Sequence, residues 1–285
     1  MVCLAIAVVL NAGTMTDLNL SAALTPIQTD ATSFTVEIPT GWEQGKGAYG
    51  GLVLGMLVRA VELAEPDPQR IVRSLAAEIP APVMPGPARI VIEPLRRGGA
   101  VSTVRAELRQ LLPDGSEEVR AHVVVVTASA RPNMPTWQTV TMPEAPAWET
   151  VHVAPVKPPM GPAFGQHFEF RVVQGMPFAG AAPVALGYVR AHRPGELRSA
   201  AYITALADVW WPCALSVIKA PRPMSTLTFG LNVINNLDGL DPALPLLHSA
   251  ESEVSSDGYA TETRRLWGHD GRLVSINHQT FVIIK

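Results

Sequence analysis

Two stretches of the chain are apolar at helical spacing around most of their circumference. The first runs from about Tyr49 to Ala64, with Pro66 and Pro68 just beyond it, and the second runs from Leu197 to Lys219. Prolines beyond the last periodic residue are a usual stop signal for a helix. A helix that is apolar on nearly every side is typical of a protein interior. The pattern therefore predicts two long, buried helices.

Shorter segments that alternate apolar and polar residues predict strands in each half of the chain. They are Ser33–Ile38, Arg89–Leu95, Ser102–Leu112 and Glu117–Ala128 in the first half, and His167–Val173, Val184–His192, Ser225–Ile234, Leu247–Val254, Tyr259–Trp267 and Leu273–Ile284 in the second. Asp114-Gly115 and Asp270-Gly271 each predict a hairpin turn, and the two turns lie 270 − 114 = 156 positions apart. The same offset aligns Asp208 in the second helix with about Leu52 in the first. The order of strand, buried helix and antiparallel hairpin thus occurs twice, which predicts a duplicated fold with a buried acid in one half only.

Proline marks the junction between the two halves. Eight of the 26 prolines fall within residues 131–162, where there is little periodicity, as is typical of an extended surface segment. We therefore expect an N-terminal unit over residues 16–130, a linker over 131–162 and a C-terminal unit over 163–285. The segment Met1–Leu10 is apolar but lacks Lys and Arg, which a signal peptide needs, and it is too short to cross a bilayer. We expect residues 1–15 to be disordered or to reflect a misassigned start, with Met15 as the alternative first residue, and Met1–Thr14 to be dispensable.

Composition and charge exclude several classes of protein. Hydrophobic residues make up 47% of the chain and charged residues 16%, which is enough apolar material for a large core. A net charge of −3 and a pI near 6.2 argue against a nucleic-acid-binding or membrane-surface protein. Cys3 and Cys213 have neither disulfide-framework nor zinc-site spacing, and the seven histidines are scattered. We therefore expect no metal and no cofactor, and a reducing, cytoplasmic setting.

Asp208 is the most unusual residue of the second predicted helix. No Lys or Arg lies within a helical turn of it, and Pro212 removes the N–H that would bond the Asp208 carbonyl, which favours a kink. Burial of an unpaired carboxylate is costly and raises its pKa. Two interpretations remain open from the sequence alone. Asp208 is either a structural residue satisfied by a distant Arg or a backbone N–H, or a functional carboxylate.

The glycines at the start of the first helix call for a separate explanation. Gly45-Lys46-Gly47-Ala48-Tyr49-Gly50 matches G-x-G-x-x-G, but antiparallel hairpins follow it rather than alternating strands and helices, so a dinucleotide fold is disfavoured. A P-loop fails because Gly41 and Gly45 are one residue too close and no Ser or Thr follows Lys46. Gly50 and Gly51 either allow a ligand to approach free backbone N–H groups or allow close packing of the helix against the sheet.

Familiar hydrolase motifs are missing from the sequence. There is no G-x-S-x-G and no H-E-x-x-H, and Cys213 is more simply a small core residue than a nucleophile. Three polar residues in apolar strands are notable instead. Thr226 and Thr228 are two apart and are expected to share one face of a strand, and Gln279 interrupts the apolar run Leu273–Ile284.

Several short motifs together resemble the acyl-CoA thioesterase II (TesB-like) family of double-hotdog proteins. They are Ala-Tyr-Gly-Gly-Leu-Val-Leu-Gly (48–55), Ala-Leu-Ala-Asp (205–208), Ser-Thr-Leu-Thr (225–228), Leu-His-Ser-Ala-Glu-Ser (247–252) and Asp-Gly-Arg-Leu-Val-Ser (270–275) followed by Gln279. The resemblance extends from about residue 30 to the C-terminus and is more specific from Leu197 on. It implies an α+β double hotdog, in which two long buried helices are each wrapped by a curved antiparallel sheet.

The resemblance also implies an activity and a set of site residues. It implies hydrolysis of acyl-CoA by a water that Asp208, Thr226 and Gln279 hold and activate, with Thr228 as an alternative to Thr226. The N–H groups of Gly50 and Gly51 would stabilise the oxyanion, and Trp210 and Trp211 would line an acyl pocket or simply pack in the core. It further implies an acyl-CoA partner and a homo-oligomer, dimer or tetramer.

The chain departs from the family pattern in three ways. The interval from Asp208 to Thr226 is shorter, Leu-Thr-Phe-Gly follows Thr226 where the family has an Asp-His pair, and the helix carries Trp210-Trp211. Two competing functions follow from the same fold. A hydratase would need an Asp-His pair, and no His follows Asp208 in its helix. A non-catalytic acyl-CoA or lipid-binding protein would need no polar triad.

Overall fold

The computed structural model describes residues 18–284, so the predictions for Met1–Thr14 lie outside the described residues. Its helices are α1 (Leu20–Ala23), α2 (Gly50–Ala64), α3 (Ala200–Asp208) and α4 (Ala214–Val217), with 3₁₀ turns at Trp148–Thr150 and Ala163–His167. Its strands are β1 (Ile27–Gln28), β2 (Ser33–Ile38), β3 (Glu43–Gln44), β4 (Gly47–Ala48), β5 (Ile71–Glu78), β6 (Gly86–Arg97), β7 (Val101–Leu111), β8 (Glu117–Ala128), β9 (Val153–Ala154), β10 (Phe168–Gln174), β11 (Val184–Ala191), β12 (Met224–Val233), β13 (Leu246–Ser256), β14 (Tyr259–Trp267) and β15 (Leu273–Ile283).

The helix α2 forms where the apolar pattern predicts it. It begins at Gly50, after Tyr49 as N-cap, and ends at Ala64, where Glu65 adopts an extended conformation ahead of Pro66. Ten of its 15 residues are buried. This burial on nearly every side, rather than a strong cap, stabilises the helix.

The second predicted helix is wrong in its C-terminal part. Instead of one helix over Leu197–Lys219, α3 ends at Asp208 and α4 begins at Ala214 after an irregular segment. Pro212 is the physical reason, because its missing N–H and its ring oppose continuation of the helix. The sequence predicted a kink at this point, and the structure has a complete break. As a result, Asp208 is the last residue of a helix and not the middle of one.

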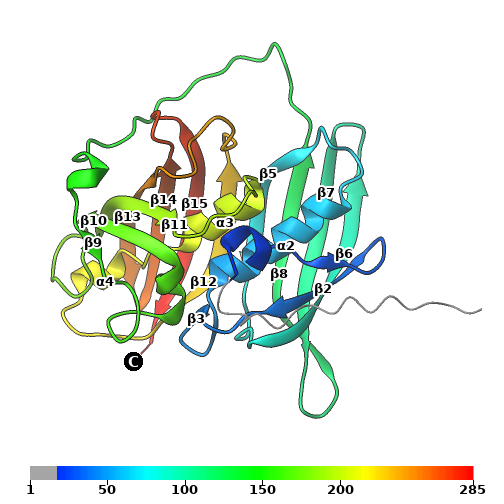
Figure 1. The fold of residues 1–285 in the computed structure, drawn as a ribbon, viewed down its shortest axis with the longest axis horizontal. Helices are drawn as coiled ribbons and strands as arrows, with labels where there is room; N and C mark the ends of the chain where they lie inside the picture. Colours follow the sequence, from blue (N-terminus) through cyan, green and yellow to red (C-terminus); the bar gives the residue numbers. More distant parts are fainter. Residues whose placement is uncertain (1–17, 285) are drawn as a thin grey trace, which may run out of the picture.

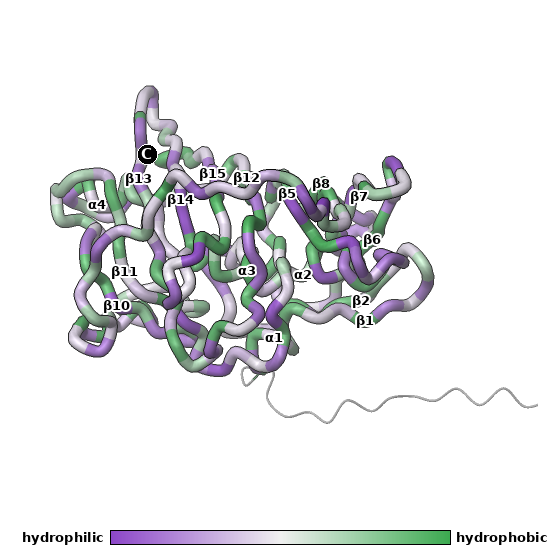
Figure 2. Tube along the Cα trace, turned by 90° about the horizontal axis from the view of Figure 1, so that it is seen from above, coloured by the Kyte–Doolittle hydropathy of each residue, from purple (hydrophilic) through white to green (hydrophobic). Residues whose placement is uncertain are grey.

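Thirteen strands form one continuous antiparallel sheet that curves around α2 and α3 (Figure 1). Their order is β1-β2-β6-β7-β8-β5-β12-β15-β14-β13-β11-β10-β9. The view from above shows β5 and β12 side by side over the two helices (Figure 2). The order confirms the prediction of two sheets that merge into a single surface with the helices inside.

The strand β5 joins the two halves, and the sequence did not reveal it. It pairs with β8 on one side and with β12 on the other, and a bulge between Val72 and Ser74 interrupts its alternation. Because the alternation of apolar residues is the main signal for a strand, such a bulge hides the strand from sequence reading.

The internal repeat is visible in the strand pairing. Leu75 of β5 lies opposite Leu231 of β12, and 231 − 75 = 156, the same offset as the Asp-Gly turns. Gly115 and Gly271 adopt φ angles of +83° and +84° in those turns, a conformation that favours glycine. The helices follow a different offset, because their first residues are 200 − 50 = 150 positions apart. Asp208 therefore corresponds to Val58 and not to Leu52 as the strand offset suggested.

The proline-rich segment between the halves lies against the outside of the second half. The Trp148 ring packs under the guanidinium groups of Arg171 and Arg190, which lie 4.9 and 5.0 Å from its centroid. The Tyr188 hydroxyl donates a 2.7 Å hydrogen bond to the Pro146 carbonyl. These contacts fix the extended segment, drawn in green across the upper left of Figure 1, on β10 and β11.

Candidate active site

Asp208 lies where the C-terminus of α3 meets the N-terminus of α2. Its side chain is only 11% exposed. A Cβ atom added to Gly50 would lie 2.8 Å from Asp208 Oδ2, and one added to Gly51 would lie 2.8 Å from the Ala205 carbonyl oxygen. The two glycines therefore bring α2 into direct contact with the carboxylate and with the last turn of α3. Tyr49 secures the crossing with a 2.8 Å hydrogen bond from its hydroxyl to the Ala205 carbonyl.

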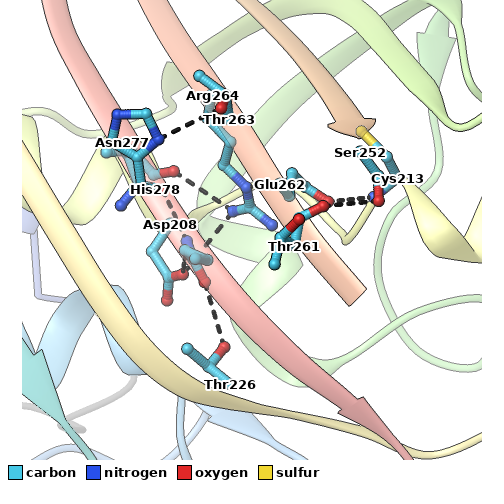
Figure 3. Close-up of polar contacts among 12 residues, drawn as sticks. Asp208, Cys213, Thr226, Ser252, Thr261, Glu262, Thr263, Arg264, Asn277 and His278 are labelled. Atoms are coloured by element: carbon cyan, nitrogen blue, oxygen red, sulfur yellow. Dashed lines mark hydrogen bonds and ion pairs between the residues drawn. The ribbon is translucent and has the colours of Figure 1, made fainter. Parts of the chain in front are cut away.

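Gln279 links Asp208 to Thr226 through a chain of hydrogen bonds. Its Nε2 donates to Asp208 Oδ1 at 3.0 Å and to Asn277 Oδ1 at 2.8 Å, and its Oε1 accepts from Thr226 Oγ1 at 3.3 Å. Asn277 is held in turn by a 2.8 Å hydrogen bond to the Gly230 carbonyl. The structure thus brings Asp208, Thr226 and Gln279 together, although 71 positions separate the first from the last. Asp208 and Thr226 are labelled in Figure 3.

Thr228 does not join this chain, because the two threonines do not share a face. A bulge in β12 between Thr226 and Thr228 leaves Leu227 unpaired, so that Thr226 faces inward with Phe229 while Thr228 is exposed. The expectation of a common face assumed regular alternation, and a one-residue bulge reverses it. Of the two candidates, Thr226 is the one that donates a hydrogen bond to Gln279.

Arg264 and Glu262 of β14 belong to the same buried cluster, and neither was predicted from the sequence. Arg264 Nη1 lies 3.8 Å from Asp208 Oδ1, and Arg264 Nε donates to Glu262 Oε1 at 2.5 Å. The side chains of Arg264 and Glu262 are only 2% and 1% exposed. The available signal was their spacing, because two charged residues two positions apart in a strand share one face. Their strand pairs Glu262 with Gln279 and Arg264 with Asn277, so four polar side chains line the inner face.

Burial and charge act in opposite directions on the carboxyl group of Asp208. Loss of solvent is the largest effect and raises its pKa above the usual 3.8, and the charge of Glu262 raises it further. The Arg264 guanidinium, the Gln279 amide and the backbone N–H of Gly51 lower the pKa but do not cancel the effect of burial. The pKa of Asp208 is therefore raised, which makes its carboxylate a stronger base than an exposed one.

The N–H of Gly51 points to Asp208, which changes its expected role. It was a candidate for binding a substrate oxygen, but in this structure it bonds the carboxylate. Gly50 is the first residue of α2, so its N–H has no acceptor within the helix. The glycine-rich motif before it is the β3–β4 hairpin, with Gly45 at a φ of +68°, and not a nucleotide-binding loop.

Trp210 and Trp211 lie in the irregular segment after α3. Trp210 is buried and stacks on the ring of His248, with centroids 4.9 Å apart and planes at 9°. The ring centroids of Phe170 and Trp210 are 5.6 Å apart, and Trp211 Nε1 donates a 2.9 Å hydrogen bond to the Gly175 carbonyl. Both rings thus take part in the packed interior of the second half.

The opposite end of the helix pair has a different arrangement. There Glu62 of α2 accepts hydrogen bonds from Ser199 Oγ at 2.7 Å and from the N–H of Ala201 at 3.2 Å. Ala201 is the second residue of α3, as Gly51 is of α2, so each helix N-terminus receives a carboxylate from the other helix. The two carboxylates do not occupy equivalent positions, because the helix offset aligns Glu62 with position 62 + 150 = 212, and only Asp208 has polar partners from the sheet.

The inner face of the first half is apolar where that of the second is polar. Subtraction of 156 from Glu262, Arg264, Asn277 and Gln279 gives Ala106, Leu108, Ala121 and Val123. These residues pair with one another in the same way, Ala106 with Val123 and Leu108 with Ala121, and all four are buried.

Within residues 18–284, no three His, Cys, Asp or Glu side chains come close enough to hold a metal ion. No helix of that region is long and apolar enough to cross a membrane.

Comparison with known families identifies the chain. The family described as "Acyl-CoA thioesterase N-terminal domain" matches residues 38–130, and "Acyl-CoA thioesterase C-terminal domain" matches residues 138–283. The chain belongs to the acyl-CoA thioesterase family. The resemblance to TesB-like proteins noted in the sequence is thereby confirmed. A search of curated proteins found no match to this family member.

Solved structures agree on the fold of this family member. A hot dog fold protein of unknown function from Alicyclobacillus acidocaldarius superimposes with a TM-score of 0.80 at 21% identity, covering 93% of this chain and 98% of the other. The tesB protein of Mycobacterium avium subs paratuberculosis gives 0.74 at 16% identity over 93% and 98% of the chains. The acyl-CoA thioesterase II TesB2 of Mycobacterium marinum gives 0.70 at 16% identity over 93% and 97%. At these identities the likeness shows the fold, and it confirms the α+β double hotdog.

Proposed function

We propose that the protein hydrolyses acyl-CoA thioesters with a water molecule that Asp208 activates as general base. Gln279 and Thr226 orient Asp208 and the water, and the start of α2 at Gly50 faces the thioester oxygen. The family supplies the class of substrate, and the residue roles are inferred from the arrangement around Asp208. Assembly into a homo-oligomer and a cytoplasmic location remain predictions.

The observation that carries the proposal is the direction of the hydrogen bonds through Gln279. Its amide group donates to Asp208 Oδ1, so its carbonyl oxygen is the acceptor for the Thr226 hydroxyl. The Thr226 oxygen then keeps its lone pairs for a water O–H. Asp208 Oδ1 is occupied by Gln279, whereas Oδ2 lies beside Gly50 at the start of α2. A water between Oδ2 and Thr226 would have one acceptor for the proton it loses and a second that fixes its orientation.

The chemistry needs no covalent intermediate. Asp208 takes a proton from the water as its oxygen attacks the thioester carbonyl carbon, and the negative charge moves to the carbonyl oxygen. The free N–H at the first position of α2 favours that charge, because a helix N-terminus carries partial positive charge. The carbon–sulfur bond then breaks, the carboxylic acid forms, and the coenzyme A thiolate leaves with the proton that Asp208 took up, which restores the Asp208 carboxylate. A carboxylate of raised pKa suits this role near neutral pH.

The direct test is release of free thiol from acyl-CoA substrates of increasing chain length. We expect protein-dependent thiol release for part of that series, with heat-denatured protein as the control. Tight binding of acyl-CoA without thiol release would contradict the proposal and support a binding protein without catalysis. The chain-length profile would also report the size of the acyl pocket.

A further inference from the structure

We propose that Arg264 and Glu262 are positioning residues that set the charge state of Asp208 in opposite directions. Arg264 favours the carboxylate form of Asp208. Glu262 pairs with Arg264 and so weakens this effect, and the Asp208 carboxylate keeps its affinity for a proton. This inference rests on the proposed role of Asp208 as the base. The Arg264–Glu262 ion pair, which the proposed mechanism does not otherwise use, would then control the pH range in which the enzyme works.

The distances show that Arg264 is shared unequally between the two acids. Its Nε is hydrogen bonded to Glu262 Oε1 at 2.5 Å, whereas its Nη1 is 3.8 Å from Asp208 Oδ1. At 3.8 Å the charges interact, but the separation is too long for a hydrogen bond. Nη1 also lies 3.4 Å from the carbonyl of Ala207, and the guanidinium sits 5.3 Å from the Phe281 ring centroid. The guanidinium is thus bound to Glu262 and only faces Asp208.

The break after α3 holds Glu262 in place. Glu262 Oε2 accepts a 2.6 Å hydrogen bond from the backbone N–H of Cys213, the residue after Pro212 (Figure 3). Because a regular helix would use that N–H internally, it is free for Glu262 only where the helix has ended. The same interruption that leaves Asp208 at a helix end therefore anchors the acid that competes with it for Arg264.

The other ionisable groups near the cluster are neutral. Burial raises the pKa of Tyr49, and the charge of Asp208 raises it further. Burial raises the pKa of the Cys213 thiol well above its usual range. Burial and the charge of Arg264 lower the pKa of His248. Asn277, Gln279 and Thr226, which face Asp208 from β15 and β12, carry no charge. Among the described residues, the cluster therefore holds two carboxylates against one guanidinium.

This balance predicts shifts of opposite sign for two substitutions. Glu262→Gln keeps the shape and can keep one of the two accepted hydrogen bonds, from Arg264 Nε or from the Cys213 N–H, but it removes one negative charge. Arg264 then stabilises the Asp208 carboxylate more strongly, and the pKa of Asp208 falls. Further replacement of Arg264 by Met, in the double variant Glu262→Gln/Arg264→Met, removes the positive charge, and the pKa of Asp208 rises. The double variant leaves no unpaired charge on either residue, which is the costly outcome of single changes in buried ion pairs.

The experiment measures kcat/KM for acyl-CoA hydrolysis as a function of pH. We expect the midpoint of the acidic limb to lie at a lower pH in Glu262→Gln than in the wild type. We expect the midpoint for the double variant to lie about one pH unit higher than that for Glu262→Gln, which is the lower end of the effect of an adjacent opposite charge. The matched control is Glu251→Gln/Arg265→Met, which removes an Arg–Glu pair between β14 and the neighbouring β13, where Arg265 Nη1 lies 3.4 Å from Glu251 Oε1. The acidic limb of the control variant should lie at the same pH as that of the wild type.

A second readout separates failure of this inference from failure of the proposed function. Infrared difference spectra, wild type minus Asp208→Asn, report the Asp208 carboxylate band during a pH titration and do not require turnover. If the wild type releases no thiol, the proposed function fails, and the titration still decides whether the ion pair controls Asp208. The inference would be overturned by limbs or titrations that stay in place, or by a double variant whose limb or titration lies at the same pH as that of Glu262→Gln or at a lower pH. If the double variant does not fold, Glu262→Gln alone decides, because an unchanged or upward shift contradicts it.

Discussion

At the scale of single residues, one extra residue in β12 decides which threonine bonds Gln279. Regular alternation places Thr226 and Thr228 on the same face, and the bulge at Leu227 turns Thr228 outward. Gln279 could be chosen from the sequence because it follows the motif Asp-Gly-Arg-Leu-Val-Ser (270–275) that resembles TesB-like proteins. The choice between the threonines could not be made, because a bulge depends on the neighbouring strand rather than on local residue types.

The two threonines therefore form a matched pair for mutagenesis. Thr226→Val removes the hydroxyl that bonds Gln279, so we expect kcat for acyl-CoA hydrolysis to fall about tenfold, the equivalent of one hydrogen bond. Thr228→Val is the control and should leave kcat near the wild-type value, because its side chain is exposed. Steady-state kinetics on both variants would reject this assignment if Thr228→Val were the more damaging change.

At the scale of elements, the crossing of α2 and α3 joins stability to function. An added Cβ at Gly55 would lie 2.5 Å from a Leu24 methyl group and 3.0 Å from the Ala201 carbonyl, far from Asp208. An added Cβ at Gly50 would instead meet Asp208 Oδ2. The same residue type therefore has a packing role at one position and a site role at the other.

Substitution of these two glycines should separate an effect on stability from an effect on activity. Gly55→Ala overpacks the helix crossing and should lower stability by about 1–3 kcal/mol, while activity per folded molecule changes little. Gly50→Ala should displace the Asp208 carboxylate and lower kcat several-fold with a smaller loss of stability. Thermal unfolding and thiol release, measured on both variants, check this. Equal effects on both quantities in the two variants would show that the glycines have no separate roles.

Most elements could be read from the sequence, and the exceptions have physical causes. The helix α2 and the hairpins with Asp-Gly turns follow from apolar periodicity and turn chemistry. The end of α3 was predicted only as a kink, because a proline can either bend or end a helix and tertiary packing selects the outcome. The strand β5 was missed because its bulge breaks the alternation.

At the scale of the whole molecule, a nearly symmetric fold carries an asymmetric site. The repeat could be recognised from the offset of 156 residues between the Asp-Gly turns, and Leu75 and Leu231 meet at the joint between the halves. The presence of Arg264 beside Asp208 could not be predicted, because it depends on how a strand near the C-terminus lies under α3. Such long-range register is not encoded in any local pattern of the sequence.

The arginine also bears on the two interpretations of Asp208 that the sequence left open. A structural aspartate was expected to find a distant Arg or a backbone N–H, and Asp208 has both in Arg264 and Gly51. The pKa of Asp208 is nevertheless raised, which means that the fold disfavours its charged form. The contribution of Asp208 to stability is thus expected to fall as the pH rises from the ordinary carboxyl pKa through the raised pKa of Asp208, since its carboxyl group binds the proton more tightly in the folded state than in the unfolded state.

The most direct test of the central claim is to measure hydrolysis and thermal unfolding on one preparation of Asp208→Asn. The substitution keeps the shape, removes the base and leaves Arg264 paired with Glu262. We expect kcat to fall by roughly 10²–10⁴-fold, the usual contribution of a general base, with little change in KM. At a pH where Asp208 is ionised in the wild type, the melting temperature of the variant should be equal to or higher than that of the wild type, because the variant buries no charge at this position. Turnover that survives while the melting temperature drops would contradict the account and make Asp208 a structural residue.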